Sequence, residues 1–241
     1  MKKIFVSILL STLLLGVIPV AAESDKNPKS ENDKGPLTKI TFIHYKKNPA
    51  KPDGFVKPSK SSCYGFLSRG AKWKTVEDYY VNPTGSLTEE NLVFNAVNAS
   101  VSEWEGYGGD IFGVGAINYD LKDNGGSMDG NNVAFFDVYS DSNVIAVSTI
   151  WGYFYGAPNT RQIVEWDIQF NTSFEWGDAE IDGTLMDIQN IATHELGHSA
   201  GLADLYTTSC SAETMYGYSI EGEISKRDLN AGDILGIQIL Y

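Results

Sequence analysis

Two histidines and a glutamate in the last quarter of the chain have the types and spacing of a metal-dependent catalytic site. His194 and His198 are four residues apart, and Glu195 directly follows the first of them. On a helix, side chains at positions i and i+4 share a face, so both imidazoles can reach one metal ion while the carboxylate lies beside it. This spacing predicts a zinc site on a helix.

A catalytic zinc ion usually has three protein ligands and one water molecule, so a third ligand is needed. The chain has only three histidines, and the third, His44, lies far upstream in a stretch rich in lysine and proline, which makes it a poor ligand. Gly201 can adopt a positive φ and end the helix three residues after His198. The turn that follows would bring Asp204 to the metal as the third ligand.

Glu195 then remains free to act as the general base. Bound zinc lowers the pKa of its water from about 15.7 to roughly 7, and a nearby carboxylate takes the proton as the water attacks a peptide carbonyl. The same carboxyl group can return the proton to the leaving amine. These residues therefore predict hydrolysis of peptide bonds.

Read in full, residues 194–204, HELGHSAGLAD, resemble the extended signature HExxHxxGxxH/D of the metzincin metalloproteases. Residues 214–218 are similar to the Met-turn of that family, and residues 233–241 to the closing helix of the matrixins within it. Two weaker similarities, to the start of the matrixin domain and to the strand before its active-site helix, fall at residues 72–74 and 165–171.

This resemblance covers about residues 70–241. It implies an α+β, metzincin-like catalytic domain: a mixed twisted β-sheet with a backing helix and an active-site helix, and a small C-terminal subdomain with the Met-turn and the closing helix. It also implies that Met215 supports the site from below and that Tyr218 is a candidate donor to the developing oxyanion. An aspartate at position 204 follows the minority pattern of the family, and we expect one catalytic zinc and no second one.

The elements that must position these residues can be read from hydrophobic periodicity and turn residues. We expect a backing helix capped by Ser86 or Thr88, an active-site helix that begins near Gly183 and Thr184, and a closing helix over residues 225–241. Strands are expected at residues 76–82, 111–119, 132–138, 143–151 and 163–170.

The resemblance gives the strand at residues 143–151 a special place, as the sheet edge above the cleft. An extended peptide substrate would pair antiparallel with such an edge, and a buried central strand is the alternative. Residues 217–219 would form a wall of the pocket that receives the residue after the cleaved bond.

The N-terminus is typical of a secretory signal peptide, with two lysines, an apolar run and the small residues Ala21 and Ala22. An uncleaved anchor helix is the alternative. Residues 23–62 are rich in polar residues and proline, which predicts a linker or a short pro-segment, and residues 63–241 form the protease domain. We therefore expect a secreted, extracellular protein that does not bind membranes after signal cleavage.

Two cysteines, Cys63 and Cys210, favour one disulfide bond in an exported chain. The matrixins suggest an alternative, because a cysteine of their propeptide ligates the zinc and keeps them latent. Cys63 lies upstream of the domain as that cysteine does, but the surrounding residues lack the Arg-Cys-Gly-x-Pro pattern of the switch. We favour the bridge.

The chain is acidic, with 31 Asp and Glu against 18 Lys and Arg and a formal net charge of −13. This balance disfavours nucleic acid as a partner, and we expect a monomer that acts on proteins or peptides. The glycine-rich acidic stretch at residues 120–132 has ligand types suited to Ca²⁺, but it lacks EF-hand spacing, so we favour a solvated loop there.

Together these features predict a secreted zinc-dependent endopeptidase. One alternative is a secreted binding module on a degenerate protease fold, which would be expected to lose Glu195 or a ligand. The other is a zinc hydrolase whose third ligand lies later in the chain, with Glu213, Glu221 and Glu223 as candidates.

Overall fold

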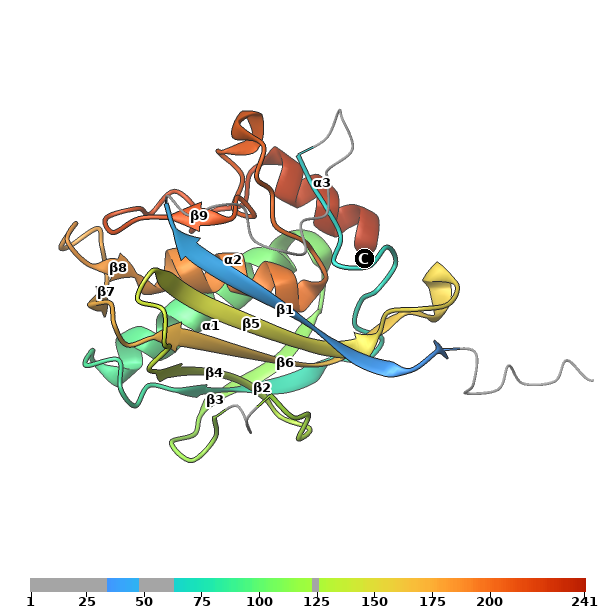
Figure 1. Cartoon of the computed structure of the whole chain (residues 1–241), viewed down its shortest axis with the longest axis horizontal. Helices are drawn as coiled ribbons and strands as arrows, with labels where there is room; N and C mark the ends of the chain where they lie inside the picture. The colour runs from blue at the N-terminus through green and yellow to red at the C-terminus, as the bar shows by residue number, and fades with distance from the viewer. Residues whose placement is uncertain (1–33, 48–62, 123–125) are drawn as a thin grey trace, which may run out of the picture. The chain divides into compact units, whose positions relative to one another are not determined.

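The structure is a computed structural model that describes residues 34–47, 63–122 and 126–241 of the chain (Figure 1). All of these residues belong to one structural unit, Glu31–Tyr241. The predicted signal peptide lies outside the described residues, as do residues 23–33 and 48–62 of the predicted linker. In the part of the chain that is described, no helix has both the length and the apolar character needed to cross a membrane.

The described residues form the α+β fold that the sequence predicts, with one large mixed sheet, a small two-stranded sheet and three α-helices (Figure 1). The strands are β1 (Leu37–Lys46), β2 (Glu77–Asn82), β3 (Phe112–Ile117), β4 (Asn132–Asp137), β5 (Val144–Tyr153), β6 (Gln162–Asn171), β7 (Trp176–Gly177), β8 (Met186–Asp187) and β9 (Tyr218–Ser219). The helices are α1 (Glu90–Gly108), α2 (Ile188–Ala200) and α3 (Ala231–Leu240), with short 3-10 turns at Pro158–Thr160 and Thr208–Cys210.

The large sheet has the strand order β3-β2-β4-β6-β5-β1-β9. Strands β3, β2, β4 and β6 run parallel to one another, whereas β5 runs antiparallel to β6. All five strands predicted after residue 63 are present, with ends shifted by up to two residues. Their recognition from sequence depended on runs of β-branched and aromatic residues, which suit a pleated and buried surface.

The strand predicted at the sheet edge, β5, is not an edge in this chain. It lies between β6 and β1, and β1 comes from the region predicted as a linker or pro-segment. β1 pairs with β5 antiparallel from Leu37 opposite Tyr153 to Tyr45 opposite Val144, and then pairs in parallel with β9 (Figure 1). A peptide-binding ladder on β5 is therefore filled by an upstream segment of the same chain.

The backing helix α1 buries Val93, Val97, Val101 and Trp104 along one face. It contacts α2, and the Trp104 indole donates a hydrogen bond to the Thr193 carbonyl at 2.7 Å. These contacts hold α2 firmly against α1 beside the sheet.

The predicted cap of α1 and the predicted start of α2 are wrong. The cap of α1 is Glu89, whose side chain accepts from the Leu92 amide, whereas Ser86 and Thr88 hydrogen-bond to each other in the preceding turn. Helix α2 begins at Ile188, about four residues later than predicted. Met186 and Asp187 are used first in strand β8, and the Asp187 side chain then caps the helix by accepting from the Asn190 amide at 2.7 Å.

The closing helix α3 begins at Ala231, six residues after its predicted start. A capping box fixes this position. The Asn230 side chain accepts a hydrogen bond from the Asp233 backbone amide, and the Asp233 side chain accepts one from the Asn230 backbone amide.

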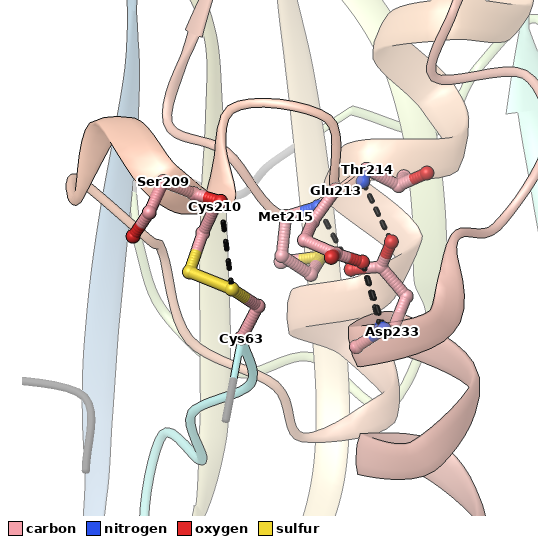
Figure 2. The surroundings of a disulfide bond; sticks show 8 residues. Cys63, Ser209, Cys210, Glu213, Thr214, Met215 and Asp233 are labelled. Atoms are coloured by element: carbon pink, nitrogen blue, oxygen red, sulfur yellow. Dashed lines mark hydrogen bonds between the residues drawn. A yellow bond between two sulfur atoms is a disulfide. The ribbon is translucent and has the colours of Figure 1, made fainter. Parts of the chain in front are cut away.

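The two cysteines form the expected disulfide bond, with 5.4 Å between the Cα atoms of Cys63 and Cys210 (Figure 2). Since these are the only cysteines in the chain, no thiol is left to act as a latency switch. The bridge ties the start of the domain to the segment just before the Met-turn.

Candidate functional site

Helix α2 and the turn after it build the candidate metal centre. His194, Glu195 and His198 are all buried on α2, and the helix ends at Gly201 with φ of 111°. The Gly201 amide donates to the His198 carbonyl at 2.9 Å and closes the last turn. This left-handed turn, which favours glycine, redirects the chain so that Asp204 faces the two histidines.

Three side-chain atoms converge at this place. The Asp204 Oδ1 atom lies 3.2 Å from His194 Nε2 and 3.4 Å from His198 Nε2. Two ligands at 2.0–2.1 Å from a tetrahedral zinc ion would be roughly 3.3–3.4 Å apart. All three atoms are buried and have no hydrogen-bond partner among the described residues. The donor types, the spacing and the unmet bonding capacity all fit one zinc ion.

The other nitrogen of each imidazole is fixed by a carbonyl oxygen. His194 Nδ1 lies 2.7 Å from the Thr214 carbonyl, and His198 Nδ1 lies 3.1 Å from the Leu202 carbonyl. Each Nδ1 therefore carries the proton, and each Nε2 keeps its lone pair for a metal.

Burial and mutual contact set the charges at this centre. Burial lowers the pKa of His194 to about 4, so its imidazole is neutral at physiological pH. Burial alone would raise the pKa of Asp204, but the close approach of the His198 and His194 imidazoles outweighs it and holds that pKa well below its ordinary value. A neutral imidazole and an ionised carboxylate are the forms that bind metals.

Tyr206 supports Asp204 and was missed by the sequence reasoning. Its hydroxyl donates to Asp204 Oδ2 at 3.1 Å, on the oxygen that does not face the histidines. Burial and the Asp204 charge both raise the pKa of Tyr206, which keeps the hydroxyl protonated. The only signal in the sequence was an aromatic hydroxyl two residues after a ligand.

Glu195 is held by two partners that lie far away in the sequence. The Ser148 hydroxyl, from β5, donates to Glu195 Oε2 at 2.6 Å, and His44 Nδ1, from β1, lies 2.9 Å from Glu195 Oε1. Burial raises the pKa of Glu195. A carboxyl group with a raised pKa is suited to accept a proton and give it back.

His44 lies in this site, although its sequence context made it a poor ligand candidate. Ligand atoms of His44, His194 and Glu195 lie within 4.8 Å of one another, and the His44 and His194 ring centres are 4.0 Å apart. Phe42, on the same side of β1, stacks on His198 with ring centres 3.8 Å apart. His44 is not part of the group formed by His194, His198 and Asp204, and it is the pairing of β1 with β5 that brings this segment to α2.

Met215 is buried directly below α2. A Cβ atom added at Gly197 would collide with the Met215 sulfur, which places the thioether against the helix between the two histidines. The turn is held by Asp233, whose carboxylate accepts from the Thr214 amide at 2.7 Å and the Met215 amide at 3.1 Å (Figure 2). The methionine thus forms an apolar floor.

Tyr218 lies on β9 and packs edge-on against Tyr206, with ring centres 5.2 Å apart. Buried Lys226 holds the segment that contains Tyr218 in place. Its ammonium donates to the backbone carbonyls of Tyr216 and Tyr218 and to the Ser219 hydroxyl. Burial lowers the pKa of Lys226 to about 8. The wall predicted at residues 217–219 is therefore anchored by a buried lysine that the sequence did not suggest.

The alternative third ligands are engaged elsewhere. Glu213 accepts from the Gly232 amide at 2.9 Å, Glu221 pairs with Lys46 at 2.6 Å, and Glu223 accepts from Ser225 at 3.0 Å. Over the described ranges, neither of the two possible metal-binding groups contains any of them, and neither contains an acid from the stretch at residues 120–132. These groups therefore give no support to a later third ligand or to a calcium site.

Comparison with known protein families identifies the part of the chain that contains this site. The family model of the matrixins matches residues 155–241, which include α2, Asp204, the Met-turn and α3. A search of curated proteins gives no match.

Proposed function

We propose that the chain is a secreted zinc-dependent endopeptidase of the matrixin type, a proposal supported by the match of the matrixin family model to residues 155–241 and by the α+β fold of the described residues. His194, His198 and Asp204 would hold the zinc ion, and Glu195 would act as general base and acid. The proposal includes a signal peptide at residues 1–22, protein or peptide substrates and a monomeric enzyme.

The observation that carries the proposal is the set of three buried, unpartnered ligand atoms with a carboxylate next to them. Bound zinc would lower the pKa of a water molecule and polarise the carbonyl of the peptide bond. Glu195 would take the proton from that water and pass it to the leaving amine. Ser148 would keep Glu195 Oε2 fixed, and Oε1, which lies 2.9 Å from His44 Nδ1, would be the oxygen that takes and returns the proton.

The rest of the site would position the substrate. If β1 were displaced from β5, an extended peptide could pair antiparallel with β5 and run beside β9, with main-chain hydrogen bonds that do not depend on its sequence. The tyrosines of the wall, Tyr216 and Tyr218, would contact the side chain that follows the cleaved bond, and Tyr218 remains a candidate donor to the oxyanion.

The first test is metal content. We expect the purified full chain to retain one zinc ion per molecule, and the Asp204→Ala variant to lose most of it. The Glu213→Ala variant is the matched control, because Glu213 lies near the Met-turn but outside the ligand group. Full zinc retention in Asp204→Ala would show that the third ligand is assigned wrongly.

The second test is hydrolysis of a proteome-derived peptide library by the purified chain and by a His44→Ala variant, in which Glu195 loses its contact with β1. We expect cleavage that a zinc chelator abolishes and that Glu195→Ala reduces by roughly 10²-fold or more. Cleavage that persists with the chelator, or in the Glu195→Ala variant, would contradict the mechanism.

A further inference from the structure

Lys226 is a buried cation that the proposed mechanism does not use. The residue is only 1% exposed. Its ammonium lies 2.7 Å from the Tyr216 carbonyl oxygen, 2.6 Å from the Tyr218 carbonyl oxygen and 2.6 Å from the Ser219 hydroxyl. An ammonium has three N–H donors, so these three contacts use all of them. The charge is therefore committed to the pocket wall and is not free to contact a substrate.

The wall itself has little else to hold it. Strand β9 has two residues and lies at the end of the large sheet, where β1 is its partner strand. The Ser219 carbonyl turns toward β1 and accepts from the Lys47 amide at 2.9 Å, whereas the Tyr218 carbonyl accepts from Lys226. A cavity of about 440 Å³ is also lined by Tyr216, Tyr218 and Ser219, so close packing does not support the wall on every side.

The backbone of Lys226 is attached to the start of the active-site helix. Its amide donates to the Asn190 side-chain oxygen at 2.7 Å, in the first turn of α2. The next residue, Arg227, donates from Nε to the carboxylate of Asp187, which caps α2, at 2.9 Å. Asn190 and Asp187 are both buried. Lys226 is thus fixed with respect to the helix that carries the proposed metal ligands and the proposed base.

A second connection joins Lys226 to the Met-turn. The Thr214 hydroxyl lies 3.4 Å from the Lys226 carbonyl oxygen and 2.8 Å from that of Asp228. The Thr214 carbonyl in turn holds His194 Nδ1 at 2.7 Å. One residue therefore connects the wall, the Met-turn and the helix, and a short chain of hydrogen bonds runs from the wall to a histidine of the metal centre.

Nearby carboxylates offset part of the cost of burying this charge. Burial lowers the pKa of Lys226 to about 8, and four carboxylates oppose that decrease, those of Glu223, Asp204, Glu195 and Asp233. The side chain is thus mainly an ammonium at pH 7 and keeps all three donors there.

We propose that Lys226 is a positioning residue that fixes the distance between the pocket wall and the metal centre, and so determines which side chain the pocket accepts after the cleaved bond. This inference depends on the proposed endopeptidase function. If a substrate took the place of β1, β9 would lose its partner strand, and Lys226 would be the main hold on the wall. A wall held in this way offers a pocket of one width, whereas a released wall would adapt to side chains of different sizes.

The test uses the full chain and three variants of the wall. Lys226→Met keeps a long side chain without a donor, Lys226→Ala leaves room for an added amine, and Ser219→Ala removes one of the three acceptors. Lys74→Met is the matched control, because Lys74 is an exposed lysine. The substrates are quenched fluorescent peptides that differ only in the residue after the bond that the enzyme cleaves.

The quantity compared is the ratio of kcat/KM between the best and the worst of these peptides. Both values come from one enzyme preparation, so a loss of folded enzyme cancels in the ratio. We expect the ratio to fall roughly tenfold or more in Lys226→Met and roughly threefold in Ser219→Ala, and to be unchanged in Lys74→Met. Propylammonium, which replaces the missing part of the side chain, should restore the ratio in Lys226→Ala, and propanol should not.

A second measurement needs no substrate. Hydrogen exchange of the Lys47 amide, which donates to the Ser219 carbonyl, should be roughly tenfold faster or more in Lys226→Met than in the parent chain, because the wall is released. If circular dichroism shows that the Lys226 variants do not fold, Ser219→Ala carries both measurements.

An unchanged ratio of kcat/KM in the folded variants, or a ratio that propylammonium and propanol restore equally, would overturn the assignment of Lys226 to selectivity. If none of the chains hydrolyses any peptide, the exchange of the Lys47 amide decides. Faster exchange would then leave the hold on the wall standing while the endopeptidase function fails, and unchanged exchange would overturn the hold itself, so the two failures are distinguishable.

Discussion

Replacing Gly201 by alanine should both destabilise the fold and weaken the metal centre. The residue has φ of 111°, a conformation that an L side chain rarely adopts, and a Cβ atom there would lie 2.7 Å from the Ala71 carbonyl oxygen and 2.8 Å from a Leu240 methyl carbon. The left-handed backbone costs roughly 1–2 kcal/mol and overpacking typically about 1–3 kcal/mol. We therefore expect Gly201→Ala to lower the free energy of unfolding by about 2–5 kcal/mol.

The assay is urea unfolding of metal-free protein, followed by tryptophan fluorescence, so that zinc binding does not contribute. Gly106→Ala is the matched control, because Gly106 lies on an exposed part of α1 with no atom within 4 Å of the added carbon. That control should gain about 0.5–1 kcal/mol, as glycine is unfavourable within a helix.

The zinc content provides a second readout for the same variant. Because the Gly201 turn delivers Asp204, the variant should also retain less zinc than the control. A loss of stability below about 1 kcal/mol in Gly201→Ala, or zinc retention equal to that of Gly106→Ala, would refute the argument that this turn sets the third ligand.

Three further predictions concern zinc affinity and the stability of the fold. Tyr206→Phe removes the hydrogen bond to Asp204 and should weaken zinc binding by roughly 10- to 100-fold in a competition titration, with little change in the circular dichroism spectrum. Replacing Cys63 and Cys210 by serine together should lower the free energy of unfolding by about 2–5 kcal/mol in urea, because the bridge closes a span of 147 residues. Hydrogen bonds from Arg227 lower the pKa of the Asp178 carboxyl below its ordinary value. The stabilisation by this pair should therefore be present above about pH 4 and be lost as the pH falls further, so the difference in stability between the parent chain and Asp178→Asn should shrink over that range.

The convergence of His194, His198 and Asp204 could be predicted from the sequence because its geometry is local. His194, His198 and the Gly201 turn lie within eight residues of one another, and helix periodicity alone orients the two imidazoles. The strands were recognised for a similar reason, since alternation and β-branched residues are properties of short segments.

The sequence-based predictions were wrong or incomplete where a contact with a distant part of the chain sets the local structure. Helix α2 starts late because Met186 and Asp187 pair with β7, which sequence periodicity does not reveal. Ser148 and His44 reach Glu195 from 47 and 151 residues away, and nothing near either residue suggests that contact. Residues 40–45 are a short apolar run that suits a strand, but nothing in this run identifies β5 as its partner.

The register of β1 decides which of its side chains face the candidate site. Since side chains alternate, a slip of one residue would point His44 and Phe42 to solvent and place Thr41 and Ile43 over the metal centre. The stacking of Phe42 on His198 and the contact of His44 with Glu195 oppose that slip. Directly after His44 the pairing with β5 shifts, so that Tyr45 lies opposite Val144 and β1 turns toward β9. Such irregularities commonly aim a side chain at an active site, and this one lies where β1 passes from the ladder of β5 to the pocket wall.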